Sequence, residues 1–87
     1  MEPNKQLILK IHDRDEVVYE GEVVSLTSFN EKGEFDVLAK HANFISLVQN
    51  KLIIVTPDNK EKEIPIKNGV IKVENNKADV YLGVGFS

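Results

Sequence analysis

The chain has no cysteine among its 87 residues. Disulfide bonds and thiolate metal sites are therefore excluded, and burial of apolar side chains has to supply the stability of the fold. Long apolar runs are also lacking. None approaches the roughly 18 residues that a membrane-spanning helix needs, and no apolar leader follows the first residues. We therefore expect a soluble protein that meets a membrane only through a partner.

Clustered basic charge is lacking as well. Eleven Lys and Arg stand against fourteen Asp and Glu, the net charge is −3, and the basic residues are scattered singly. A phosphate backbone attracts a concentrated basic surface, so nucleic acid is not an expected partner. No glycine-rich phosphate loop precedes a helical segment either, and we expect no bound cofactor.

The residues that are present are sufficient for one folded domain. Hydrophobic residues make up 41% and charged residues 29% of the sequence, which is typical of globular proteins. A chain of this length forms a single domain, here residues 1–87, around a thin core. We expect its free energy of unfolding to be about 4 to 13 kcal/mol.

The hydrophobic pattern has mainly the period of two that is typical of β-strands. Turn signals interrupt it about every eight to twelve residues, which is the spacing of an all-β sandwich or barrel. The expected strands include 7–11, 17–19, 21–29, 52–56, 64–66, 70–73 and 78–82, with turns at 13–16, 30–33, 57–60, 68–69 and 75–76. We predict an all-β, two-sheet β-sandwich of about eight to ten short, mainly antiparallel strands without C-terminal helices.

Two segments fit this pattern less simply. Pro65 lacks the N–H that a central ladder needs, so we place it at a sheet edge or a bulge. The segment 44–52 has apolar residues at helical spacing, but it is short and contains three poor helix formers. We expect this segment to be extended or irregular.

Catalytic and metal chemistry have weak candidates. His12 and the acidic turn 13–16 could supply metal ligands, but their spacing fits no recognised metal loop. Ser46, His41 and Asp36 could form a nucleophile, base and acid, but no nucleophile elbow or glycine-rich oxyanion site accompanies them. We therefore predict no catalytic residue and no metal site, and a small hydrolase or metal protein is the least favoured interpretation.

Three segments together resemble one known family. Residues 33–42 (Gly-Glu-Phe-Asp-Val-Leu-Ala-Lys-His-Ala) resemble the Gly-Glu-aromatic-Gly-Val-Leu-Pro-Gly-His-Ala signature in the β-sandwich domain of the F-type ATP synthase epsilon subunit. Residues 7–23 look like the beginning of that domain, in which an apolar strand and a turn precede aromatic-x-Gly-x-Val. Residues 68–80 look like its Gly-Gly-aromatic-x-x-Val-x-x-Asn-x-x-x-Val segment. The three segments follow one another in the order of the family.

The chain departs from the family around its turn histidine. Asp36 and Lys40 stand where the family commonly has glycine, and Ala39 and Asn43 stand where it has proline. The rigid turn chemistry of the family is therefore reduced. The sequence also stops where typical members continue into a helical hairpin, and we expect a natural short form without the inhibition or ATP binding that the hairpin carries.

The resemblance implies a non-catalytic central-stalk subunit of an F-type ATP synthase. Such a subunit binds the gamma subunit and the c-ring and helps couple proton-driven rotation to ATP synthesis. It would be a monomer when isolated. Through the complex it would be a peripheral protein on the cytoplasmic face of a bacterial inner or plasma membrane.

The same resemblance implies two groups of contact residues. Glu31 and Glu34 would face the c-ring, whereas Lys40, His41 and Phe44 would face the gamma subunit. Each group also has a simpler interpretation in the residues themselves. Glu31 fits a solvated turn, His41 a hydrogen-bonded turn histidine and Phe44 a core side chain.

A second function remains open on the sequence. The chain could be a free-standing β-sandwich that binds another protein and is unrelated to ATP synthase. A reading frame that adjoins those for the beta and gamma subunits would favour the synthase, and an isolated reading frame would favour the adaptor.

Overall fold

The computed structural model describes residues 7–40 and 43–83, which form seven strands and no helix. The strands are β1 (Leu7–Asp13), β2 (Glu16–Val23), β3 (Ser25–Asn30), β4 (Gly33–Leu38), β5 (Phe44–Val55), β6 (Glu61–Glu74) and β7 (Lys77–Leu82). The all-β prediction is confirmed. The strand count of these residues is slightly below the expected range, because β5 and β6 are each longer than the sequence pattern indicated.

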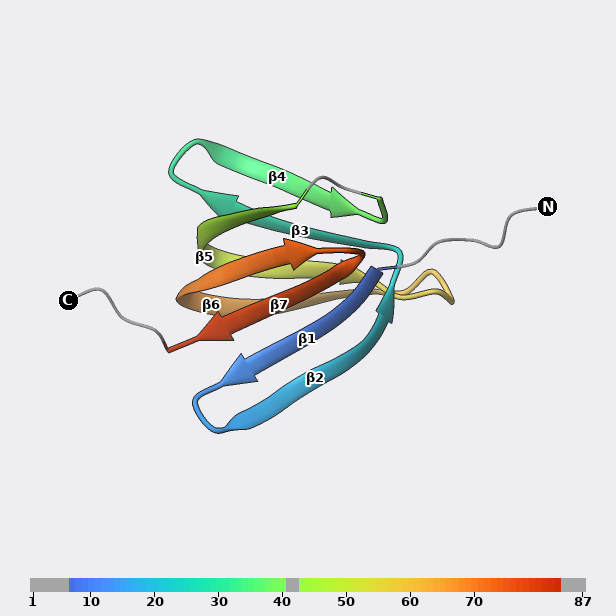
Figure 1. The fold of residues 1–87 in the computed structure, drawn as a ribbon, viewed down its shortest axis with the longest axis horizontal. Coiled ribbons are helices and arrows are strands. Elements are labelled where there is room, and N and C mark those ends of the chain that lie inside the picture. Colours follow the sequence, from blue (N-terminus) through green and yellow to red (C-terminus); the bar gives the residue numbers. More distant parts are fainter. Residues whose placement is uncertain (1–6, 41–42, 84–87) are drawn as a thin grey trace.

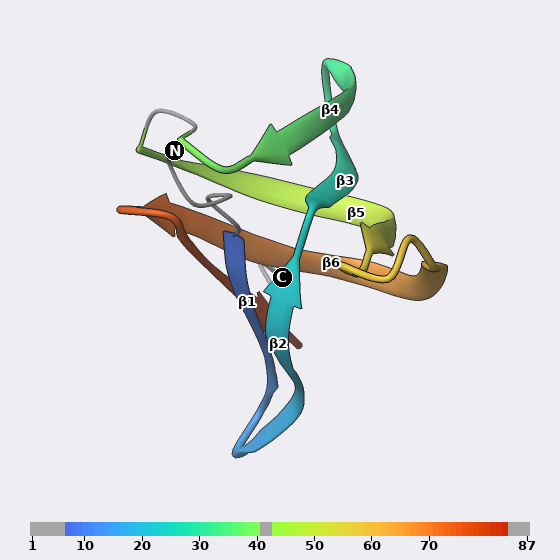
Figure 2. The ribbon, with the colours of Figure 1, turned by 90° about the vertical axis from the view of Figure 1, so that its right-hand side faces the viewer.

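The strands form one continuous hydrogen-bonded sheet in the order β2-β1-β7-β6-β5-β3-β4. Neighbouring strands are antiparallel except β1 and β7, which run parallel. The sheet folds over itself into two layers because β5 and β6 turn from one layer into the other (Figure 1). Figure 2 shows the β1–β2 and β3–β4 hairpins on opposite sides of the β5–β6 pair.

A bulge marks the place where β5 and β6 bend. Gln49 pairs with Asn68 and Lys51 with Pro65, so two residues of β6 oppose the single residue Asn50, whose φ is 80°. Such a bulge adds twist and bends the strands. It divides β5 into an amino-terminal half (Phe44–Gln49) and a carboxy-terminal half (Lys51–Val55).

Pro65 lies beside this bulge, as predicted. The described ladder between β6 and β7 begins only at Gly69, so the first half of β6 is also a sheet edge. Pro65 has no N–H to donate to the strand opposite it. The carbonyl of its partner Lys51 instead accepts a hydrogen bond from the buried Ser28 hydroxyl at 3.0 Å.

The turn expected at residues 68–69 is wrong, because both residues lie inside β6. Gly69 is buried where β6 passes between β5 and β7. A Cβ atom at this position would lie 2.7 Å from the carbonyl oxygen of Tyr81. This glycine therefore permits close approach of two backbones and does not mark a turn.

The long strand expected over residues 21–29 is also wrong, because it is divided at Val24. β2 ends at Val23 and β3 begins at Ser25, and the Val24 N–H donates to the carbonyl of Val55 at 2.7 Å. The chain passes from one layer to the other at Val24. The apolar pattern over residues 21–29 therefore belongs to the end of β2 in one layer and to β3 in the other.

Asparagine and other turn residues close the remaining connections as expected. Arg14, Asn59, Asn75 and Asn76 all have positive φ values, between 52° and 68°. Asn75 and Asn76 form the two-residue connection between β6 and β7, which suits the left-handed backbone of a tight hairpin. The turns at 13–16, 57–60 and 75–76 are therefore confirmed.

The core lies between the two layers and draws on every strand. Its buried apolar side chains are Leu7, Leu9, Ile11, Val23, Leu26, Val37, Val48, Leu52, Ile54, Ile71, Val73, Ala78 and Val80. The segment 44–52 contributes to this core as part of β5, so the extended conformation expected there is confirmed.

Candidate functional site

The two carboxylates predicted to face a ring lie at one end of the sandwich. Glu31 occupies the exposed turn between β3 and β4, and Glu34 is exposed on β4 opposite Phe29. The turn is held by the Asn30 side chain, whose Oδ1 accepts the N–H of Lys32 at 2.8 Å. Gly33 follows with a φ of 122°, a backbone conformation that glycine adopts without the strain a Cβ atom would bring.

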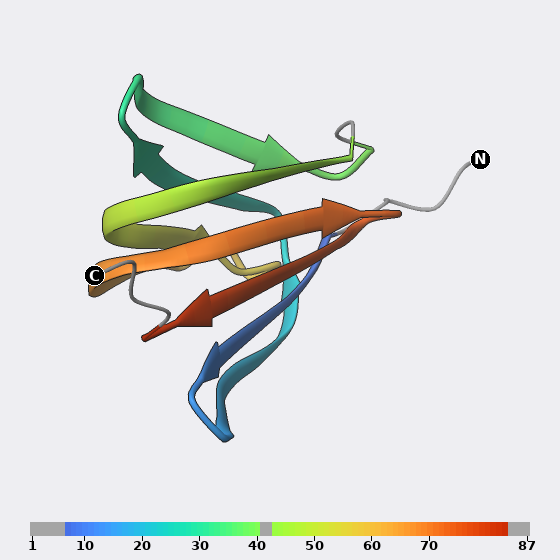
Figure 3. The same cartoon turned by 60° about the vertical axis from the view of Figure 1, so that its left-hand side comes forward.

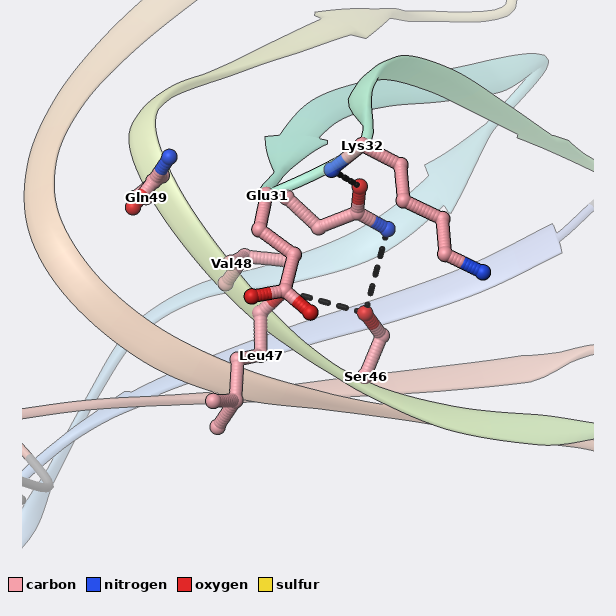
Figure 4. A pocket seen from close by; sticks show the side chains of 7 residues that line it. Glu31, Lys32, Ser46, Leu47, Val48 and Gln49 are labelled. Carbon is pink, nitrogen blue, oxygen red and sulfur yellow. Dashed lines mark hydrogen bonds between the residues drawn. The ribbon is translucent and has the colours of Figure 1, made fainter.

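A hollow of about 310 Å³ lies between this turn and the amino-terminal half of β5. Figure 4 shows Glu31 on one side of the hollow and Ser46 and Leu47 on the other. Asn30 Nδ2 donates to Ser46 Oγ at 3.4 Å, and Ser46 Oγ donates to the carbonyl of Leu47 at 3.0 Å. One side-chain bridge therefore links the β3–β4 turn to β5 across this hollow.

Two of the three residues predicted to face the gamma subunit, Lys40 and Phe44, lie within the described part of the chain, after β4 and at the beginning of β5. Lys40 is exposed after β4 and has a φ of 68°, so a lysine adopts the left-handed backbone where the family commonly has glycine. The Lys40 N–H donates to Asn76 Oδ1 at 2.6 Å, and the Asn75 N–H donates to Asn43 Oδ1 at 3.1 Å. His41 lies outside the described residues.

Phe44 is half-buried at the beginning of β5. Its ring meets the ring of Phe35 edge to face, with 6.0 Å between centroids and 80° between planes. Both rings pack against the core. Edge-to-face pairs of this kind add stability beyond their buried area, so Phe44 has a structural role whether or not it also contacts a partner.

The alternative catalytic and metal residues are engaged elsewhere. Asp36 accepts a hydrogen bond from Thr27 Oγ1 at 2.6 Å. His12 Nε2 lies 3.0 Å from Asp79 Oδ1, and its ring stacks on Tyr81 at 4.5 Å between centroids. Within residues 7–40 and 43–83, no three His, Asp or Glu side chains are grouped as metal ligands.

The family model for the ATP synthase delta/epsilon chain β-sandwich domain matches residues 6–82. The chain belongs to this family. It is 40% identical over 73 residues to an ATP synthase epsilon chain of Nitratiruptor, covering 83% of this chain and 57% of the relative. It is 37% identical over 78 residues to the ATP synthase epsilon chain of Sulfurimonas denitrificans, covering 88% of this chain and 60% of the relative. The chain thus spans somewhat over half the length of these curated relatives.

Solved structures share the fold at lower identity. A chain in the cryo-EM structure of the Euglena gracilis mitochondrial ATP synthase (OSCP, F1 and c-ring) matches with a TM-score of 0.85 and 22% identity, covering 94% of this chain and 53% of that chain. A chain in the central stalk and c-ring structure from Tetrahymena thermophila matches with a TM-score of 0.73 and 11% identity, covering 94% of this chain and 66% of that chain. The described residues contain no helix of the length and hydropathy needed to cross a membrane.

Sequence reasoning missed the asparagine contacts that join the connection after β4 to the β6–β7 turn. Asn43 and Asn76 each accept a backbone N–H from the other connection. The chain has asparagine at position 43 where the family commonly has proline, and this departure was the available signal. Asparagine can accept a hydrogen bond that proline cannot, so the connection is held by side-chain contacts.

Proposed function

We propose that this chain is a non-catalytic central-stalk subunit of an F-type ATP synthase. In this role it binds the gamma subunit and the c-ring and helps couple proton-driven rotation to ATP synthesis. The family match over residues 6–82 carries the proposal, and relatives named ATP synthase epsilon chain support it. The protein is peripheral, associated with the cytoplasmic face of a bacterial inner or plasma membrane through the complex, and monomeric when isolated.

The arrangement of the two ends supports a bridging role. Glu31 and Glu34 are exposed at the end of β4 that carries the β3–β4 turn, and Lys40 is exposed beyond the other end of β4. Phe44 begins β5 and packs against Phe35 of β4. A small domain that joins two partners needs separate surfaces for them. In the proposal the carboxylates meet basic or amide groups of the c-ring, adding orientation more than affinity.

The stalk contact has a different chemistry. Lys40 supplies a charge at the rim, and the aromatic ring of Phe44 supplies an anchor, because partly buried aromatic residues carry much of the energy of protein interfaces. His41, next to Lys40 in the sequence, belongs to the same proposed contact.

Calorimetric titration of the chain into the gamma subunit from the same genome tests the proposal. We expect saturable one-to-one binding that Lys40→Ala weakens and that Phe44→Ala weakens more. Glu34→Lys is expected to matter only when the c-ring is present. Glu20→Lys, an exposed substitution on β2, is the matched charge control and should leave both interactions unchanged.

The folding of each variant has to be measured beside its binding. Phe44→Ala removes the contact with Phe35 and could therefore unfold the domain. Its binding to the gamma subunit is compared with that of the wild type only if circular dichroism, without denaturant, shows that the variant has the native β-sheet. A correctly folded wild-type chain that shows no saturable binding to the gamma subunit would contradict the proposed function.

A further inference from the structure

The β6–β7 turn is hydrogen-bonded to two other segments of the chain. Asn76, half-buried in this turn, accepts the Lys40 N–H through its side-chain oxygen at 2.6 Å and the Ile8 N–H through its carbonyl at 2.9 Å. The Asn75 N–H donates to Asn43 Oδ1 at 3.1 Å. Figure 3 shows the turn on the same side of the molecule as the end of β4 and the beginning of β5. The turn therefore contacts the beginning of β1 and both ends of the β4–β5 connection.

The strands that flank this turn have neighbours on both sides. Val73 of β6 pairs with Phe44 and with Ala78. Ala78 of β7 also pairs with Leu9. β4, by contrast, is the last strand of the sheet, and its described pairing is with β3 alone. The bond to Asn76 therefore ties the chain that leaves an edge strand to the middle of the sheet.

Lys40 has a backbone conformation that needs such support. Its φ is 68°, in the left-handed region, where a residue with a Cβ atom is strained. Strained backbones of this kind persist where the surrounding structure holds them, and they are frequent at binding sites. The Asn76 side chain holds this one by accepting its N–H. The direction in which the exposed Lys40 side chain leaves the backbone therefore depends on Asn76.

The two asparagine side-chain contacts are better suited to positioning than to stabilising. Each lies at the surface, where water can replace a lost partner, so its net contribution to folding is modest. Both nevertheless act on one short connection, which begins at Lys40 and ends at Asn43, directly before Phe44. A segment that is ordered before binding does not have to be ordered by the partner, and this raises affinity.

We propose that Asn76 and Asn43 are positioning residues for the contact with the gamma subunit. Through their side-chain oxygens they hold the connection after β4, so that Lys40 and Phe44 are presented to the partner in one arrangement. The proposal rests on the proposed function, which assigns Lys40 and Phe44 to this contact. Neither asparagine has to touch the gamma subunit itself.

Nuclear magnetic resonance of the free chain tests the positioning without any partner. In the wild type we expect the Lys40 amide to have an order parameter near the roughly 0.85 of an ordered backbone. In Asn76→Gly, which keeps the positive φ available but removes the acceptor, it should fall to about 0.6 or less. Asn76→Asp keeps an acceptor and also tolerates this backbone, so it should restore the wild-type value.

Calorimetric titration into the gamma subunit then measures the consequence for binding. Asn76→Gly and Asn43→Ala should each weaken binding about three- to tenfold, because the partner then has to order the connection on association. Asn76→Asp and Asn43→Asp should bind within about twofold of the wild type, since their carboxylates can accept the same N–H groups.

Two controls separate positioning from stability and from charge. Ser28→Ala removes a buried hydrogen bond to the Lys51 carbonyl, so it lowers stability without touching the asparagine contacts. It should leave binding unchanged, because a domain with the stability expected here remains almost fully folded after such a loss. Asn75→Asp adds a carboxylate at a neighbouring position whose side chain accepts neither bond, and it should also bind like the wild type.

The outcomes separate this inference from the proposed function. If the wild type and Asn76→Gly bind the gamma subunit equally, the positioning role is overturned and the stalk function stands. A Lys40 amide that stays ordered in Asn76→Gly overturns the positioning role whatever the binding result. Asn76→Asp binding as weakly as Asn76→Gly, with normal binding by Asn75→Asp, overturns it too. If the folded wild type does not bind the gamma subunit, both are overturned.

Discussion

The two halves of β5 belong to one strand but have opposite surroundings. The carboxy-terminal half lies between β6 and β3, and its Leu52 and Ile54 side chains are fully buried. In the amino-terminal half, Ile45 and Leu47 are more than half exposed. Each half presents one isoleucine and one leucine, so local preference does not distinguish the halves. The difference comes from whether a second strand lies alongside.

The two halves therefore contribute differently to the stability of the fold. The buried side chains of Leu52 and Ile54, together with pairing on both edges, make the carboxy-terminal half a contributor to the free energy of folding. The amino-terminal half contributes Val48 to the core and packs Phe44 against it, while Ile45 and Leu47 remain largely exposed. The bulge at Asn50 allows this division, because the strand leaves β3 where the register shifts.

The largest expected difference is between two leucines of β5. Leu52→Ala should lower the free energy of unfolding by about 2 to 5 kcal/mol, because it removes a fully buried side chain and leaves a cavity. Leu47→Ala should change it by less than about 0.5 kcal/mol, because the side chain is already largely in water. Urea denaturation of both variants measures the difference. If both variants lost the same free energy of unfolding, the two halves of β5 would contribute equally to stability and the comparison would fail.

The close packing of β6 beside the amino-terminal half gives the next effect. Gly69→Ala should destabilise the fold by about 1 to 3 kcal/mol, because the new Cβ would meet the Tyr81 carbonyl oxygen at 2.7 Å. Gly21→Ala is the matched control, since a Cβ there meets the side chain of Tyr19 at an ordinary 3.5 Å. If denaturation gave the two alanine variants the same free energy of unfolding, the close backbone contact at Gly69 would be contradicted.

The asparagine contacts before β5 should matter less. Asn76→Gly keeps the positive φ available but removes the acceptor of the Lys40 N–H, so we expect a loss of about 0.5 to 1.5 kcal/mol. Asn76→Ala should cost more, because alanine is also strained at a φ of 64°. Thermal and urea unfolding can rank the two variants. If alanine were the milder substitution, backbone strain would not contribute at this turn.

The smallest effect is expected from an ion pair beside the carboxy-terminal half. Lys51 Nζ lies 3.6 Å from Glu63 Oε1, and both side chains are at least one-third exposed. Glu63→Gln should therefore change the free energy of unfolding by less than about 1 kcal/mol, and added salt should reduce the difference further. Denaturation at low and high ionic strength checks this. A large loss of stability that persists in high salt would contradict the prediction, because a solvent-exposed ion pair is screened by salt.

Much of the fold could be predicted because it depends on local patterns. Alternating apolar residues predicted the strands, and the turns at Asn59, Asn75 and Asn76 adopt the left-handed backbone that asparagine tolerates. Pro65 was correctly placed at an edge and bulge because its missing N–H restricts it to such positions. The family resemblance, carried by motifs spread over residues 7–80, predicted the family to which the chain belongs.

The errors occurred where a glycine or valine pattern has two structural meanings. Asn68-Gly69 has the composition of a turn, but the glycine serves close contact between β6 and β7. The apolar run around Val24 has the composition of one long strand, but the chain changes layers there. The candidate contact residues could be named from the sequence, yet the packing of Phe44 against Phe35 of β4 depends on how the strands are placed in space.

The amino-acid sequence by itself determined the all-β class, most of the turns and the family, because each depends on residue types over a few neighbouring positions or on their order along the chain. The tertiary structure decided which strands merge, where β5 and β6 bend and which edge remains unpaired. These features depend on contacts between residues far apart in the sequence. Ile45 and Leu47 resemble any apolar strand residues until the ends of β3 and β6 are known, because exposure depends on which neighbouring strands are present.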